Sequence, residues 1–313
     1  MRVFAAALAL ASSLAAAQAY PSKPVRVILP FAGGTDAVAR LLAQKLSPAL
    51  GQQVLPDPHL GAGGNIAHLA AARAAPDGYT LLMAAPPLVI NPNLNPKAGF
   101  DPLRDFAPIA LLTAIPNVLV VHPKVSAATL AQLIEAARAA PGKLTYGSGG
   151  VGSANHLAAE LLKSAARIDI LHVPYKSATI ALTGLLGGEV DIVIVAASSA
   201  APYVKDKRLR ALAVLDAKRS SAMPEVPTSA EAGTPLVAVN WYILLAPAGT
   251  PRAIVARLNA ESVKAMAAPD IRERLAGLGG EPLSGSPEEV AVFLRKEYEQ
   301  WGRVIREAGI KAE

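Results

Sequence analysis

The chain has 313 residues, of which 52% are hydrophobic, 17% are charged and 4% are aromatic. This composition is too apolar for a disordered chain, and its 26 prolines and 24 glycines exclude a coiled coil. The lack of cysteine excludes disulfides, thiolate nucleophiles and iron–sulfur sites, and five scattered histidines argue against a metal site. The net charge of +6 comes without a basic stripe and stacking aromatics, so we predict no nucleic-acid partner.

The first 19 residues have the order of a secretory signal peptide. Arg2 precedes an apolar run from Val3 to Leu14, and small residues end in Ala17-Gln18-Ala19. A membrane anchor is the alternative, but the apolar run is too short for one. We therefore expect residues 1–19 to be a signal peptide cleaved before Tyr20, which leaves a soluble, exported protein.

Strand and helix patterns alternate along the rest of the chain. The expected strands are 25–29, 53–55, 80–83, 118–121, 144–146, 168–173, 190–195, 209–214 and 241–245. The expected helices are 36–50, 66–74, 130–139, 155–165, 178–186, 252–267 and 287–307. Such alternation predicts an α/β fold in which mainly parallel strands have helices on both faces.

The two strand-rich parts of the chain predict two domains. We place crossover strands near 117–122 and 239–245, because both segments are extended, apolar and flanked by prolines. The first domain then comprises 20–118 plus 243–313, and the second comprises 119–242. The cleft between two such domains is where a ligand is expected.

Glycine-rich turns join a strand to a helix at 31–36, 61–65 and 147–153. Glycine lets the backbone approach a ligand without a Cβ in the way. The first N–H groups of a helix lack internal partners and carry partial positive charge, so such turns attract carboxylate or phosphate. Each could be a tight turn and nothing more, but three of them in both predicted domains favour an anion held between the domains.

Signatures of catalysis are weak. Residues 147–152 read G-x-G-x-x-G after a predicted strand, and Asp169 lies near the spacing of a ribose-binding acid, which leaves an exported dinucleotide-dependent enzyme as an alternative. No G-x-S-x-G motif occurs, and no acid is placed to orient His156 beside Ser148 or Ser153. We predict no catalytic residue, no metal and no cofactor.

Short motifs follow one another from the start of the mature chain to its last third. They include YPSKPVR at 20–26, GAGGN at 61–65, APDGYTLL at 75–82, HVPYK at 172–176 and LAPAGTP at 245–251. The ordered set resembles the Bug family of periplasmic solute receptors, which serve tripartite tricarboxylate transporters. The resemblance implies a monomeric, two-domain periplasmic binding protein fold of type II that closes on a small carboxylate, with membrane permease subunits as partners.

The resemblance also implies a binding site made of two pincer turns, 31–36 and 147–156. Backbone amides, hydroxyls and ordered waters would hold the carboxylate there. The residues expected at the ligand are Phe31, Ala32, Gly33, Gly34, Thr35, Asp36, Gly63, Asn65, Ala84, Ala85, Ser148, Gly149, Gly150, Val151, Ser153, His156, Tyr175 and Val195.

Departures from the family pattern bear on the ligand. The first pincer is shorter than usual, because Phe31 meets Ala32 directly. Ala84-Ala85 stand where small polar residues or glycine are common, and Val195-Ala196 stand where an Asp-Asn pair is common. Polar groups of amino acids or hydroxy acids would be buried unpaired in such a pocket. We therefore expect a mono- or dicarboxylate with an apolar or aromatic body.

The leading interpretation is a non-catalytic receptor that delivers an organic acid to a tripartite tricarboxylate-type transporter. A ligand-sensing receptor that feeds a signalling complex is the second interpretation, because the same docking face would serve it. Trp241 and Tyr242 fit a place in a domain core better than one in the cleft.

Overall fold

The computed structural model describes residues 20–311, so the predicted signal peptide lies outside the described residues. The strands are β1 Val25–Leu29, β2 Val54–Pro58, β3 Thr80–Ala84, β4 Phe106–Val121, β5 Thr145–Ser148, β6 Leu171–Pro174, β7 Ile192–Ala196, β8 Arg210–Val214, β9 Val239–Pro247 and β10 Glu281–Pro282. The helices are α2 Gly34–Leu50, α3 Asn65–Ala72, α4 Pro87–Leu94, α5 Leu130–Ala139, α6 Ala154–Ala166, α7 Ala178–Leu186, α8 Ala197–Lys205, α9 Arg252–Met266, α10 Pro269–Gly277 and α11 Pro287–Glu307, with a short 3-10 helix η2 at Ala62–Gly64.

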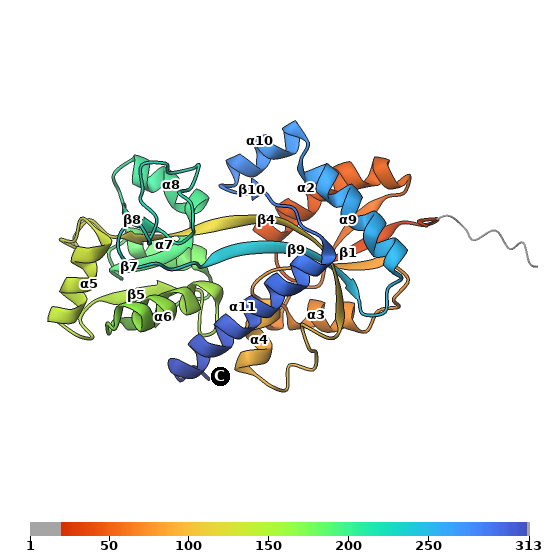
Figure 1. Cartoon of the computed structure of the whole chain (residues 1–313). Helices are drawn as coiled ribbons and strands as arrows, with labels where there is room; N and C mark the ends of the chain where they lie inside the picture. Colours follow the sequence, from red (N-terminus) through yellow and green to blue (C-terminus); the bar gives the residue numbers. More distant parts are fainter. Residues whose placement is uncertain (1–19, 312–313) are drawn as a thin grey trace, which may run out of the picture.

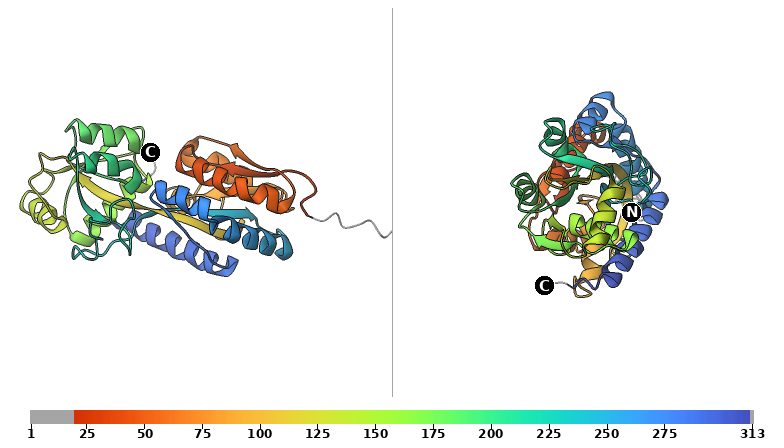
Figure 2. Two further views of the ribbon diagram at one scale, coloured as in Figure 1. Left: turned by 90° about the horizontal axis from the view of Figure 1, so that it is seen from above. Right: turned by 90° about the vertical axis from the view of Figure 1, so that its left-hand side faces the viewer.

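The long strand β4 belongs to two sheets (Figures 1 and 2). In the first sheet β1 pairs in parallel with β2 and β3, and β9 lies antiparallel between β3 and residues 106–116 of β4. In the second sheet β5 pairs in parallel with β6 and β7, and residues 117–121 of β4 lie antiparallel between β7 and β8. The predicted α/β fold is confirmed, with parallel pairing away from β4 and β9 and antiparallel pairing around them.

Differences from the predicted elements have a common cause in proline. The structure has helices α4, α8 and α10 where none is predicted, and each contains a proline in its interior or at its start. Proline removes a backbone donor and discourages a helix assignment. β4 is much longer than the predicted strand 118–121 and includes Pro108 and Pro116. A register shift follows Pro108, and Pro116 pairs in register with Val239 of β9.

Helix α11 packs on β4 and against helices α4 and α6, and Figure 1 shows it crossing obliquely below the long strands β4 and β9. It begins with a capping box in which Ser286 and Glu289 satisfy each other's backbone N–H groups. On its buried face Glu297 Oε2 accepts hydrogen bonds from Trp241 Nε1 of β9 at 2.7 Å and from Trp301 Nε1 at 3.0 Å. Burial raises the pKa of Glu297. Trp241 is thus a core residue that fastens β9 to α11.

A pair of asparagines marks the place where β4 passes from the first sheet to the second. Asn117 is buried, and its Nδ2 donates to the carbonyl of Ala238 at 2.9 Å. Its Oδ1 accepts from Asn240 Nδ2 of β9 at 2.8 Å. The two long strands are therefore hydrogen-bonded to each other through side chains at this junction.

Candidate ligand-binding site

The first glycine turn presents a row of free backbone donors. It follows β1 and leads into α2, whose N-cap is Gly33 and whose first turn has no side-chain cap. The amides of residues 32–36 make no hydrogen bond to any part of the chain that the structure describes. Asp36, the acidic residue of this first turn, accepts from Arg40 Nε at 2.8 Å. An anion therefore meets unpaired N–H groups at the positive end of a long helix.

Glycine is required at position 33 by its backbone conformation. Its φ of 77° and ψ of −123° lie in a region that side-chain-bearing residues avoid. A Cβ there would have no neighbour within 4 Å. The space in front of this turn is thus open to a ligand.

The second glycine turn, 61–65, is held between the first turn and α4. A Cβ on Gly64 would lie 2.9 Å from the Cζ atom of Phe31. Asn91 Nδ2 of α4 donates to the carbonyl of Gly63 and to Asn65 Oδ1, both at 2.8 Å. The side chain of Asn65 is therefore already engaged within the protein.

The third glycine turn, between β5 and α6, reaches the other end of α4. A Cβ on Gly152 would lie 2.5 Å from Leu94 Cδ1. Helix α4 thus touches the second turn through Asn91 and the third turn through Leu94, and Phe31 joins the first turn to the second. The structure brings the three predicted turns together around a helix that sequence reasoning missed.

The third turn uses many of its donors internally. The amide of Gly149 donates to Asn155 Oδ1, that of Gly150 to Ser148 Oγ, and that of Gly152 to His156 Nδ1. Ser153 caps α6 by accepting from the amide of His156. The sequence predicts free glycine amides here, and the structure corrects this. Within this turn, the amides that have no partner in residues 20–311 are instead those of Val151, Ala154 and Asn155.

The stacked rings of Tyr146, His172 and His156 pack against the third turn. Ser148 Oγ lies 2.6 Å from His172 Nε2, and the rings of His156 and His172 stack with centroids 4.1 Å apart. Tyr146 stacks on His172 and donates to Glu160 at 2.6 Å. Burial lowers the pKa of His156 to about 4, so its Nδ1 is an acceptor for the turn at neutral pH. These side chains fix the shape of the turn.

Four of the residues expected at the ligand offer no free polar side-chain group there. Ala84, Ala85 and Val195 are buried in the hydrophobic core at strand ends. The hydroxyl of Tyr175 donates to Glu189 at 3.0 Å, while its ring lies against Gly147 and its backbone carbonyl approaches Gly150. The strand ends therefore contribute apolar support and no polar side chain.

A buried histidine lies directly beneath the second turn. His68 of α3 is fully buried against Phe100, and neither ring nitrogen has a hydrogen-bond partner. Burial lowers the pKa of His68 from its ordinary 6.5 to about 3. The ring is consequently neutral and unsatisfied in the folded protein.

Replacing His68 with leucine is expected to stabilise the protein by about 1–3 kcal/mol at pH 7, because an unsatisfied buried polar group is removed. As the pH falls from 6.5 towards 3, the unfolded wild-type chain binds a proton that the folded one does not. The advantage of the H68L variant should therefore widen on acidification. Urea unfolding of both proteins at pH 7.5 and pH 5 measures this, and a constant or reversed difference would contradict it.

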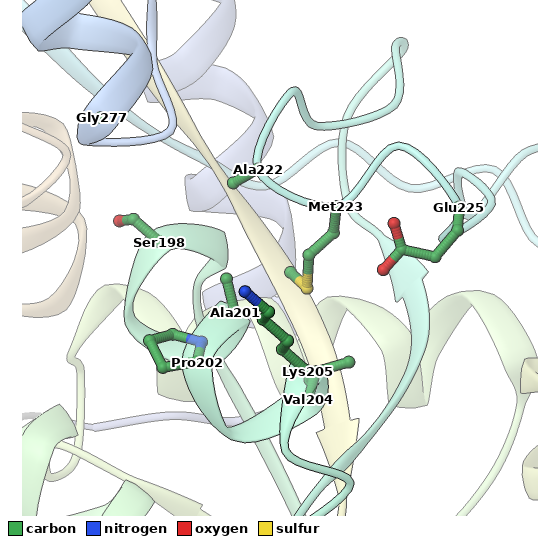
Figure 3. Close-up of a pocket in the computed structure, with 9 residues that line it drawn as sticks. All are labelled: Ser198, Ala201, Pro202, Val204, Lys205, Ala222, Met223, Glu225 and Gly277. Atoms are coloured by element: carbon green, nitrogen blue, oxygen red, sulfur yellow. The ribbon is translucent and has the colours of Figure 1, made fainter.

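A cavity of about 600 Å³ lies apart from the glycine turns, between α8, the loop 222–225 and Gly277 of α10. Figure 3 shows Met223 and Lys205 close together among its lining residues, with Glu225 to one side. It contains none of the residues predicted at the ligand. Within residues 20–311 no cluster of three or more potential metal ligands occurs, and no helix is both long and apolar enough to cross a membrane.

Comparison with known proteins identifies the family to which the chain belongs. Residues 38–310 match the family described as the tripartite tricarboxylate transporter family receptor. The chain is 41% identical to the UPF0065 protein in the tcbD-tcbE intergenic region of Pseudomonas sp. strain P51, over 98% of this chain and 93% of that protein. It is 36% identical to Protein BugT of Bordetella pertussis, over 99% of this chain and 96% of that protein.

Solved structures agree with this placement. R. palustris Rpa4515 with adipate is 34% identical with a TM-score of 0.82, covering 93% of this chain and 99% of that one. MatC from Rhodopseudomonas palustris with bound malate is 33% identical with a TM-score of 0.78, covering 91% of this chain and 100% of that one. The periplasmic binding protein BugD is 31% identical with a TM-score of 0.79, covering 94% of this chain and 100% of that one. Since these are receptors and binding proteins, the enzyme alternative is set aside, and the chain belongs to the family of tripartite tricarboxylate transporter receptors, the Bug-type solute-binding proteins.

Proposed function

We propose that the protein is an exported periplasmic receptor that captures a small organic carboxylate and delivers it to the permease subunits of a tripartite tricarboxylate-type transporter. The ligand is held between two domains, 20–118 plus 243–313 and 119–242, by the turns 31–36 and 147–156. The observation that carries the proposal is the row of unpaired amides at residues 32–36, at the uncapped N-terminus of α2. The related structures with adipate and malate support a carboxylate as the ligand.

We further propose that the ligand has an apolar or aromatic body. Ala84, Ala85 and Val195 offer no acceptor for an ammonium or hydroxyl group, and Asn65 is engaged with Asn91. An amino acid held at the turns would find no acceptor for its charged ammonium group on these side chains, and leaving that group unpaired is costly.

Calorimetric titration of the chain without residues 1–19 tests both proposals. Adipate and benzoate are expected to bind at least about tenfold more tightly than aspartate and citrate, which corresponds to 1.4 kcal/mol. Aspartate binding as tight as adipate binding would contradict the apolar body. Absence of binding to every acid in the panel would contradict the carboxylate receptor itself.

A further inference from the structure

The hydroxyl group of Tyr242 lies against the first residue of α2. Tyr242 belongs to β9 of the first sheet and is 8% exposed. A Cβ on Gly34 would lie 2.2 Å from the phenolic oxygen and 3.2 Å from Cζ. The φ of Gly34 is not in the left-handed region, so the backbone does not require glycine there. Glycine at position 34 instead makes room for the Tyr242 hydroxyl.

This hydroxyl has no hydrogen-bond partner in the part of the chain that the structure describes. It makes no hydrogen bond within residues 20–311, whereas its neighbour Trp241 uses its donor on Glu297. Burial raises the pKa of Tyr242 to about 12, so the O–H keeps its proton at any physiological pH. Its oxygen is not among the buried side-chain atoms of residues 20–311 that are shielded from solvent without a partner, so a ligand atom can reach it. Phenylalanine would fill the same apolar space, so packing alone does not call for the O–H group.

The surroundings of the hydroxyl indicate an anion as the missing partner. The N–H groups of residues 32–36 are also unpaired, and Ala32 and Gly33 are exposed to solvent. The carboxylate of Asp36 accepts a hydrogen bond from Arg40 on the surface of α2, and this ion pair offsets its negative charge. A carboxylate has two oxygens that together accept about four hydrogen bonds, enough for helix amides and one hydroxyl.

We propose that Tyr242 is a specificity-determining residue whose hydroxyl donates a hydrogen bond to the carboxylate of the ligand at the first glycine turn. This inference rests on the proposed function and adds a side chain from β9 to the backbone donors of α2. Hydrogen bonds from O–H groups to carboxylate oxygens are short and about twice as strong as neutral ones. The hydroxyl therefore favours a carboxylate over a neutral amide or ester of the same shape.

The Tyr242→Phe variant tests the inference, with adipate as the probe. Removal of the hydroxyl should lower the affinity for adipate about 10- to 100-fold, as expected for a lost hydrogen bond to a charged group. The unfolding temperature of the ligand-free variant should be unchanged or higher, because the deleted group has no partner. Tyr298→Phe on α11, which deletes the same atom away from the turns, is the matched control and should keep wild-type affinity.

The outcomes separate this inference from the proposed function. Wild-type affinity in Tyr242→Phe, with adipate still bound by the wild-type protein, would overturn the role of Tyr242 and leave the receptor proposal standing. A large loss of stability in the ligand-free variant would also overturn it, because the hydroxyl would then have a structural role. A wild-type protein that binds neither adipate nor benzoate would overturn both.

Discussion

Replacing Gly33 with leucine is expected to abolish binding of carboxylates while the chain still folds. The backbone at position 33 is one that only glycine adopts without strain, and a side chain there would project into the open space before the first turn. The strain costs about 1–3 kcal/mol, which is less than the roughly 5–15 kcal/mol that stabilises a typical folded protein. The leucine side chain would block access to the amides of residues 32–36, so affinity should fall at least about 100-fold.

Gly51→Leu provides the matched control. Gly51 ends the same helix with a φ of 71°, and a Cβ there would also have no neighbour within 4 Å. This variant carries the same side chain at the other end of α2 and should bind adipate with wild-type affinity. Calorimetry and circular dichroism on both variants measure affinity and folding. Equal loss of affinity in both would show that α2 is perturbed as a whole, and normal affinity in Gly33→Leu would remove the first turn from the site.

Replacing Glu297 with leucine is expected to lower the free energy of unfolding by about 2–6 kcal/mol. Both indole N–H groups of Trp241 and Trp301 donate to Glu297 Oε2, and each would be left buried without an acceptor at about 1–3 kcal/mol. Glu297→Gln keeps an oxygen at this position and should lose less than about 1 kcal/mol. Burial already disfavours the charged form of Glu297, which is why its neutral isostere is tolerated.

Urea unfolding followed by tryptophan fluorescence distinguishes the two Glu297 variants. A similar loss in both would mean that the negative charge, rather than the acceptor oxygen, holds β9 to α11. A negligible loss in Glu297→Leu would mean that the indole groups find other partners, which would contradict the assignment of Glu297 as a core acceptor.

Local sequence signals account for most of the fold and for the location of the three turns. The predicted ranges 130–139, 155–165, 178–186 and 287–307 agree closely with α5, α6, α7 and α11, because local residue patterns specify each of these helices. Helices α4 and α8 contain internal prolines, and tertiary packing rather than local preference makes them helical. The antiparallel placement of β9 in the first sheet depends on partners far along the chain, which no local pattern records.

The chemistry of the site is only partly local. Glycine spacing identifies the turns, but it does not show that Asn155, Ser148 and His156 satisfy the amides of the third turn. The approach of Tyr242 to Gly34 joins residues that lie far apart in the sequence, so it becomes visible only in three dimensions. The sequence carries one signal of this approach. Gly33 alone accounts for the backbone of the turn, so the second glycine, Gly34, needs another reason.

The position of β9 affects the order in which the chain can fold. β9 lies between β3 and β4, yet residues 122–238, which hold most of the second sheet, come between β4 and β9 in the chain. The second sheet can form from contiguous chain, whereas the first sheet stays incomplete until β9 arrives. Closing that long loop carries an entropic cost and slows folding. Tyr242 comes to lie against the first residue of α2 only when β9 joins the sheet, so this contact depends on closure of the long loop.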